Sequence, residues 1–265
     1  MIIIPDVHGR KMWKDACSKV QDNETIIFLG DYLDPYPDEF PKIKILDLQT
    51  QAIENFKEII EYKKEHKNVI LLVGNHDLGY FVSRRISSCR SDLKHYDEIR
   101  KLFIDNKKLF QFCYKAVING KTYIFSHAGI RCEWLDMFKE NKDIDVCDWL
   151  NNEFDIMIND EYPSETSFAT ELAIYSYWRG WTGEKNGSPI WSDVREWLIH
   201  YEKDLNKYKE YQIFGHTRSS FIITEYFAMI DDSDKPRGIR LNDEGQLEEL
   251  DGTKINQNIQ DILKS

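Results

Sequence analysis

Three short apolar runs near the amino terminus constrain the fold more than any other feature of the sequence. Residues 2–4, 25–29 and 69–73 are almost wholly β-branched or otherwise apolar, which is typical of strands that are buried on both faces. Residues 10–20 and 43–66 lie between them and are expected to be helical, since the second stretch repeats apolar positions at helical spacing. This alternation predicts a parallel sheet whose functional loops gather at the carboxyl ends of the strands.

The remaining sequence predicts further strands and a helical insertion. Residues 114–125 read as a hairpin with a type I′ turn at Asn119-Gly120, and residues 130–210 as a largely helical cap. Further strands are expected at residues 211–214, 222–225, 228–230, 239–241 and 246–250, the last four as closing antiparallel strands. The expected fold is one α/β domain over residues 1–265, with central mixed sheets flanked by helices.

Charge and cysteine content narrow the functional classes. The net charge of −11 argues against non-specific nucleic-acid binding, which needs a basic surface. The first apolar run ends at Pro5 and is too short for a signal peptide or a membrane span, so a cytoplasmic protein with no membrane partner is expected. The five cysteines form no C-x-x-C pair and are odd in number, which suits reduced thiols. The oligomeric state is not indicated.

Each of five predicted strand ends is followed by a loop with Asp, Asn or His and a nearby glycine. The five loops are Asp6-Val7-His8-Gly9, Gly30-Asp31-Tyr32-Leu33-Asp34, Gly74-Asn75-His76-Asp77, Ser126-His127-Ala128-Gly129 and Gly215-His216-Thr217. One such motif is weak, because a lone histidine in such a loop is more often capped or solvated. Five such motifs, each after a predicted strand, would require five independent coincidences if the loops had no common function. Mixed imidazole and carboxylate ligands suit zinc, iron or manganese, and the two oxygens of Asp31 could bridge two ions.

The order D-x-H, G-D-x-x-D, G-N-H-D, H-A-G, G-H-T resembles that of the calcineurin-like metallophosphoesterases, and most closely their phosphoprotein-phosphatase branch with its bacterial and phage enzymes. This resemblance implies a β-sandwich with a helical cap and two divalent transition-metal ions, with manganese first and iron or zinc as alternatives. It implies metal ligation by Asp6, His8, Asp31, Asn75, His127 and His216, with Asp31 bridging. It also implies that His76 is the general acid and that Asp34 orients it.

Two arginines of this family are missing from the chain. Relatives continue G-D-x-x-D with Arg-Gly to grip the phosphate, whereas Pro35 and Tyr36 follow here, and Val73 stands where some relatives have arginine before G-N-H. Arg10, Arg179, Arg195 and Arg218 are the candidates to replace them, and we expect at least one of the last three to project into the cleft. Arg218 also stands where the diesterase branch has a second histidine, which favours the phosphatase branch.

The predicted function is therefore hydrolysis of a phosphomonoester, either a phosphoprotein or a small phosphorylated metabolite. One alternative is a pyrophosphohydrolase that acts on dinucleoside polyphosphates. Another is a non-catalytic binding module on the same fold, against which the complete ligand set argues. The ring-rich residues 175–191 either pack the cap onto the sheet or line the substrate cleft.

Overall fold

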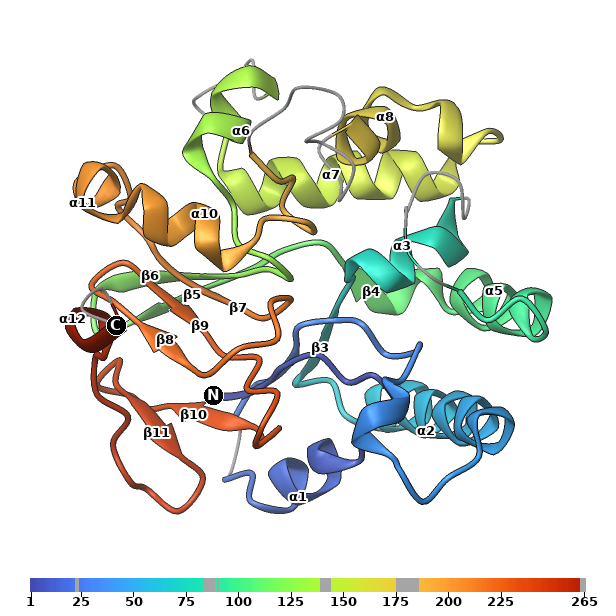
Figure 1. The fold of residues 1–265 in the computed structure, drawn as a ribbon. Helices are drawn as coiled ribbons and strands as arrows, with labels where there is room; N and C mark the ends of the chain where they lie inside the picture. Colours follow the sequence, from blue (N-terminus) through green and yellow to red (C-terminus); the bar gives the residue numbers. More distant parts are fainter. Residues whose placement is uncertain (22–23, 83–88, 90, 139–143, 175–185, 263–265) are drawn as a thin grey trace.

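A computed structural model describes residues 1–265 except 22–23, 83–88, 90, 139–143, 175–185 and 263–265. Two β-sheets lie at the centre of the described chain, and helices lie on their outer sides (Figure 1). This arrangement confirms the predicted α/β class with central mixed sheets flanked by helices.

The first sheet contains the strands expected near the amino terminus. Its order is β11 (Leu247–Glu249), β10 (Ile239–Leu241), β1 (Ile2–Ile4), β2 (Ile26–Phe28), β3 (Val69–Leu72) and β4 (Phe110–Gln111). Strands β1, β2 and β3 are parallel, as predicted; β4, which was not predicted, runs parallel to β3, and β10 pairs antiparallel with both β1 and β11. The carboxyl ends of β1, β2 and β3 therefore meet at one edge of the sheet.

The second sheet has a parallel centre that the sequence analysis did not predict. Its order is β5 (Tyr114–Ile118), β6 (Lys121–Phe125), β7 (Tyr211–Phe214), β9 (Phe227–Met229) and β8 (Ile222–Ile223). The predicted hairpin is confirmed, since β5 and β6 are antiparallel and Asn119 and Gly120 have the positive φ values (49° and 74°) that a type I′ turn needs. The expected closing strands are antiparallel where β8 pairs with β9 and where β10 pairs with β1 and β11, but the pairing of β9 with β7 departs from that expectation. β9 runs parallel to β7, because the chain passes through β8 before it returns.

Alternation along the strands divides the core into layers. Ile3 and Ile27 of the first sheet pack with Phe125 and Ile213 of the second sheet in one buried cluster between the two sheets. Their neighbours point to the other face; Ile2, for example, belongs to the cluster that packs with the helices. The side chains of successive strand residues point to opposite faces, so a run of buried apolar residues requires cover on both sides.

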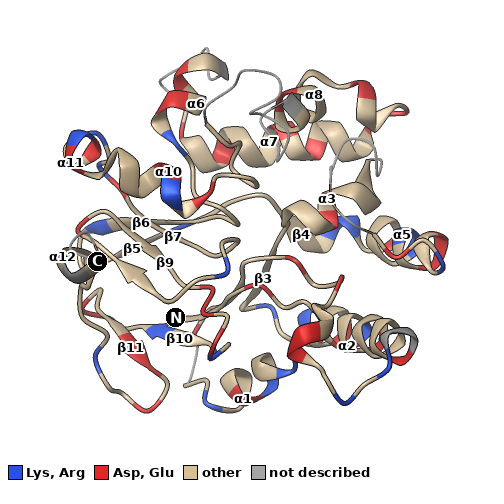
Figure 2. Cartoon of the chain, viewed as in Figure 1, with Lys and Arg blue, Asp and Glu red and all other residues tan. Residues whose placement is uncertain are grey.

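The helices supply that cover. They are α1 (Met12–Ser18), α2 (Ile45–Glu65), α3 (Asn75–Phe81), α5 (Tyr96–Asp105), α6 (Cys132–Phe138), α7 (Val146–Asn159), α8 (Ser167–Ile174), α10 (Val194–Ile199), α11 (Tyr201–Asp204) and α12 (Ile259–Ile262). Trp13 of α1 and Phe56 of α2 are buried in the cluster on the outer face of the first sheet, whereas Trp197 of α10 packs with Phe214 and Phe227 of the second. Both signs of charge occur along outer helices such as α5 and α11 (Figure 2). No described helix has the length and apolar character needed to cross a membrane.

The described parts of residues 130–210 consist of helices and irregular segments and contain no strand, as expected. Aromatic side chains pack α7 and α8 against the end of the first sheet. Phe112, directly after β4, contacts Phe154 of α7 and Phe168 of α8, with ring centroids 5.9 and 5.3 Å apart. Of the ring-rich stretch, Trp191 is buried and its ring lies 5.5 Å from that of His216, whereas residues 175–185 lie outside the described chain. The single-domain organisation and the cap boundaries stay predictions.

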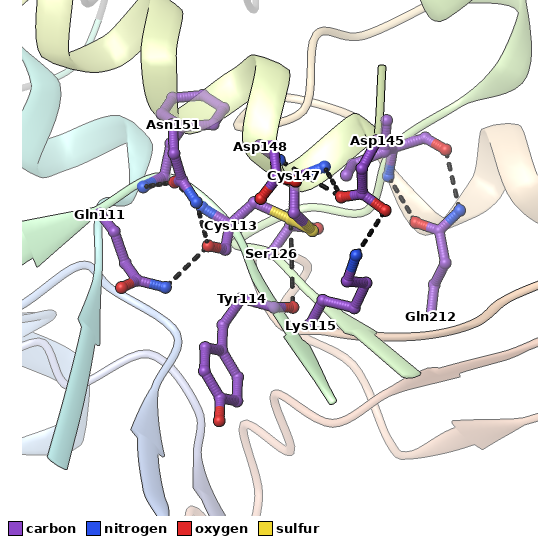
Figure 3. The surroundings of a disulfide bond; sticks show 12 residues. Gln111, Cys113, Tyr114, Lys115, Ser126, Asp145, Cys147, Asp148, Asn151 and Gln212 are labelled. Carbon is purple, nitrogen blue, oxygen red and sulfur yellow. Dashed lines mark hydrogen bonds and ion pairs between the residues drawn. A yellow bond between two sulfur atoms is a disulfide. The ribbon is translucent and has the colours of Figure 1, made fainter. Parts of the chain in front are cut away.

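The prediction of reduced thiols is wrong for two of the five cysteines. Cys113, just before β5, forms a disulfide with Cys147 in the first turn of α7 (Figure 3), with their Cα atoms 5.2 Å apart. Asn151 of α7 strengthens the same junction, because its side-chain oxygen accepts hydrogen bonds from the backbone N–H groups of Phe112 and Cys113. The two cysteines are 34 residues apart in the chain, so their spacing gave no sign of the pairing.

Candidate metal centre

All six predicted metal ligands lie at the carboxyl ends of parallel strands. Asp6 and His8 follow β1, Asp31 follows β2, Asn75 follows β3, His127 follows β6 and His216 follows β7. Asn75, His76 and Asp77 are not in a free loop, because they form the first turn of α3. The two sheets together bring these residues to one place, where each of the six is buried or nearly so.

Glycine lets the carboxylates approach the neighbouring backbone closely. A methyl group added at Gly74 would lie 2.1 Å from Oδ1 of Asp31, and one added at Gly215 would lie 2.2 Å from Oδ1 of Asp6. The Asp6 carboxylate uses this space to accept a hydrogen bond from the backbone N–H of His216 at 3.0 Å. A carboxylate of the first sheet is therefore fastened to a loop of the second.

The backbone of the site is strained. Five described residues other than glycine have positive φ, and four of them belong to the predicted site: His8 (42°), Asp31 (52°), Asp34 (56°) and His216 (70°). Such conformations cost about 1–3 kcal/mol each and persist where the surroundings fix them, which is common at functional sites. The turns that carry these side chains are thus held in place by the fold.

One group of atoms consists of the side chains of Asn75, His127 and His216. The Oδ1 atom of Asn75 lies 2.8 Å from Nε2 of His127 and 3.1 Å from Nδ1 of His216, and the two ring nitrogens are 3.2 Å apart. Three atoms that can donate electron pairs to a metal therefore converge on one point.

A second group surrounds Asp31. Its Oδ2 atom lies 3.4 Å from Nε2 of His8 and 3.6 Å from Nε2 of His127, so it faces both groups. Asp6, Asp31 and His127 form one set of potential ligands, and His8, Asp31 and His76 form another; within each set the ligand atoms lie within 4.8 Å of one another. Asp31 is common to both sets, as a bridging ligand would be.

Main-chain carbonyls fix which histidine nitrogen carries a proton. Nδ1 of His8 lies 2.8 Å from the carbonyl oxygen of Leu33, and Nδ1 of His127 lies 2.9 Å from that of Leu29. A carbonyl only accepts, so Nδ1 donates in both rings and Nε2 of the neutral ring carries a lone pair. In His127 that lone pair would face the Asn75 oxygen, another acceptor. The arrangement thus requires a proton or a metal cation between them, and this donor set fits a divalent transition metal.

The pKa values of these groups reflect their crowding. Burial opposes charge on Asp31, but His127, His76 and His8 hold its pKa well below the usual range. Burial also opposes charge on His127, but Asp31 and Asp6 raise its pKa above the usual value. Burial and the neighbouring His127 lower the pKa of His216 to about 3, so its ring is neutral at pH 7, as a metal ligand must be.

His76 and Asp34 form a hydrogen-bonded pair beside the ligand groups. Nδ1 of His76 lies 2.9 Å from Oδ2 of Asp34, and the His76 ring stands at 87° to that of His8, with centroids 5.1 Å apart. The pairing has the geometry expected when a carboxylate orients a histidine. His76 also lies within reach of Asp31 and His8, so its position alone fits either a proton donor or a ligand.

The sequence analysis did not assign a role to Asp77, which proves to connect two of the loops. Its buried carboxylate accepts hydrogen bonds from the backbone N–H groups of Asp31 (2.7 Å), Tyr32 (3.1 Å) and Gly74 (2.9 Å). The only signal in the sequence is an acidic residue three positions after Gly74, which is typical of a residue that caps a helix.

The four arginine candidates lie in different surroundings. Arg195 is 80% exposed and forms two hydrogen bonds to its neighbour Asp193, at 2.9 and 2.6 Å. Arg10 is buried and forms a bidentate ion pair with Glu39 at 2.6 and 2.7 Å. Arg179 lies outside the described residues.

Arg218 lies next to the ligand loops. Its guanidinium carbon is 4.0 Å from the centroid of the Tyr36 ring, and that ring in turn packs edge-on against His8 at 4.7 Å. Nη2 of Arg218 forms ion pairs with the carboxylates of Asp38 and Glu39, at 3.1 and 3.0 Å. The segment that replaces Arg-Gly of relatives is thus held against both His8 and Arg218.

A family model and solved structures match this chain. The family model for the calcineurin-like phosphoesterases matches residues 2–219. No curated protein matches the chain. Among solved structures, a cold-active protein tyrosine phosphatase determined at 1.1 Å is similar over 97% of this chain and 79% of its own, with a TM-score of 0.51 and 14% identity, which is a likeness of fold.

Proposed function

Because the chain belongs to the calcineurin-like phosphoesterase family, and is therefore a metal-dependent phosphoesterase, we propose that it hydrolyses phosphomonoesters with two divalent ions bound. The observation that carries the proposal is the pair of ligand groups that share Asp31, with His76 and Asp34 beside them. Asp6 and His8 would hold one ion, Asn75, His127 and His216 the other, and Asp31 both. Manganese is the first candidate, and iron or zinc would suit the same ligands.

When bound, two such ions would polarise the phosphoryl oxygens and lower the pKa of a water molecule, so that it could lose a proton at neutral pH and attack phosphorus. The chain itself would supply the proton for the leaving oxygen. Asp34 accepts from Nδ1 of His76 and so stabilises the charged ring and directs Nε2 towards the leaving group. A positioned general acid of this kind contributes about 10²–10⁴-fold to the rate.

Arg218 supports a monoester substrate, since it stands where diesterases of this family have a second histidine. We propose a phosphoprotein or a small phosphorylated metabolite as the substrate, in line with the name of the structurally similar protein tyrosine phosphatase. Arg179, Arg195 and Arg218 remain the proposed phosphate-binding residues. The position of Arg218 over Tyr36, beside His8, fits that role better than the exposed position of Arg195.

One observation favours a second candidate function, hydrolysis of dinucleoside polyphosphates. Arg195 and Arg218 are both already paired with carboxylates, so neither offers an uncompensated positive charge to a phosphomonoester dianion. A pyrophosphate linkage spreads its charge over more atoms and depends less on a single guanidinium.

The test is a screen of the purified full chain, with manganese, iron or zinc added, against alkyl and aryl phosphomonoesters, phosphopeptides, diesters and dinucleoside polyphosphates. Monoester hydrolysis that depends on metal, with two ions per chain by elemental analysis, is the expected result. Release of mononucleotides from the dinucleotide substrates alone would replace it with the second candidate. Metal content near zero in a folded protein would overturn both.

A pair of histidine variants tests the role of His76. His76→Asn should lower turnover by about 10²–10⁴-fold and keep two ions per chain. His95→Asn is the matched control, because His95 pairs with Asp92 in the same way (2.6 Å) but belongs to neither ligand group. If His76→Asn instead loses metal, His76 is a ligand and the general-acid assignment is wrong.

A further inference from the structure

We propose that Cys89 is a positioning residue, which orients the Asn75 amide so that its oxygen, and not its nitrogen, faces His127 and His216. The inference rests on the proposed function, since it concerns a side chain assigned there to a metal. Nδ2 of Asn75 donates to Sγ of Cys89 at 3.1 Å, while Oδ1 of Asn75 faces the two histidines at 2.8 and 3.1 Å.

The contact between the two residues is reciprocal. The Cys89 thiol donates to the main-chain oxygen of Asn75 at 3.1 Å and accepts from its side-chain nitrogen at the same distance. A thiol has a proton to donate and lone pairs to accept with, and it is protonated at pH 7 at its ordinary pKa. Cys89 thus contacts both the main chain and the side chain of one residue, although it lies 14 positions further along the chain.

The orientation matters because the two ends of an amide have nearly the same shape and opposite chemistry. The oxygen can bind a cation, whereas the NH₂ group can only donate hydrogen bonds. Asn75 is 1% exposed, so water does not compensate for a lost partner there. Sγ of Cys89 is the only acceptor that the described residues offer to this NH₂ group. Without the sulfur, an oxygen-inward amide loses that acceptor, and this favours rotation of the NH₂ group towards the histidines.

This role predicts a loss of metal affinity when the acceptor is removed. Residues that orient a metal ligand typically contribute 10–100-fold to metal affinity. Cys89→Val, which has a similar volume and no polar atom, should therefore weaken Mn²⁺ binding by about 10-fold or more. Cys89→Ser keeps a donor and an acceptor and should stay within about threefold of the parent protein. Cys17→Val is the matched control, since Cys17 is a free, partly buried thiol outside the site.

A second background separates positioning from packing. In Asn75→Asp both side-chain oxygens are equivalent, so no partner is needed to choose between them. Cys89→Val should then change Mn²⁺ affinity by less than about threefold. A loss of the same size in both backgrounds would show that Cys89 only fills space, and would overturn the inference.

The experiment is a titration of the metal-free full chain with Mn²⁺ alone, followed by calorimetry, with the thermal midpoint of each metal-free variant as a check on folding. Cys89→Ala, which adds no branched bulk, replaces the valine variant if that variant does not fold. If the parent protein binds no Mn²⁺, the proposed function itself fails. If the parent protein binds Mn²⁺ and Cys89→Val binds equally well, only the role of Cys89 is refuted.

Discussion

Replacing Asp77 tests whether hydrogen bonds or charge explain its place in the site. The carboxylate accepts from three backbone N–H groups, those of Asp31, Tyr32 and Gly74, and all three residues are buried. Asp77→Ala leaves these donors without a partner, and a buried unsatisfied donor costs about 1–3 kcal/mol. Alanine also removes a carboxyl whose pKa is raised to about 7, first by burial and then by Asp31, so part of the loss is recovered.

We therefore take the low end of that range for each bond and expect Asp77→Ala to lower the free energy of unfolding by about 3 kcal/mol. For a chain of this size, this corresponds to a fall of roughly 6–12 °C in the thermal midpoint. Asp77→Asn can keep an oxygen between Asp31 and Gly74 and loses only the bond from Tyr32, so about 1 kcal/mol is expected.

The assay is thermal unfolding of the metal-free protein at pH 7, followed by calorimetric Mn²⁺ titration. Both variants should bind Mn²⁺ more weakly than the parent protein, and alanine more weakly than asparagine, because the backbone that carries Asp31 is less firmly held. If both variants unfold at a higher temperature than the parent protein, relief of the repulsion between Asp77 and Asp31 outweighs the hydrogen bonds. The reasoning would then be wrong.

Three further outcomes are expected. Asp34→Asn should lower kcat about 10–100-fold for alkyl phosphates and much less for nitrophenyl phosphate in steady-state assays, because an acidic leaving group depends little on the proton from His76. Burial raises the pKa of Asp6 from 3.8 to about 6; His127 opposes this shift and Asp31 adds to it. Between pH 3.8 and about 6, the Asp6 carboxyl is therefore protonated in the folded metal-free protein but ionised in the unfolded chain. The stability that this bound proton contributes is lost as the pH rises through about 6. Because Mn²⁺ must displace the proton to bind Asp6, the apparent Mn²⁺ affinity measured by titration should rise from pH 5 to pH 7. Reduction of the Cys113–Cys147 disulfide should lower the free energy of unfolding by about 3–4 kcal/mol in denaturant titrations, and Cys147→Ser should be equally destabilised and insensitive to reductant.

The sequence predicted the parts of the site that depend on local pattern. Buried parallel strands gather their carboxyl ends at one edge, so the loops that contain Asp6, Asp31 and Asn75 could be assigned to one place before any coordinates were known. The hairpin turn at Asn119-Gly120 was predictable for a similar reason, because few residues tolerate positive φ at both central positions.

Features that depend on contacts between distant residues were not predictable. The thiol of Cys89 meets Asn75 from 14 residues away, and Cys113 meets Cys147 from 34 residues away, through segments whose path only packing determines. The parallel pairing of β9 with β7 was not predicted, because apolar alternation is the same in parallel and antiparallel strands. The surroundings of Arg195 and Arg218 depend on nearby carboxylates that a motif comparison does not include.

The position of β1 in the first sheet has a consequence for synthesis of the chain. β1 lies between β2 and β10, and Leu241 of β10 is 240 residues later in the chain than Met1, whose carbonyl oxygen it contacts. On the ribosome, β1 and β2 can pair early, but the other edge of β1 has no native partner until β10 has emerged. An uncovered, wholly apolar strand edge is a template for pairing with other chains. Newly made chains should therefore be most prone to aggregate, and most dependent on chaperones, until β10 has been translated and can pair with β1.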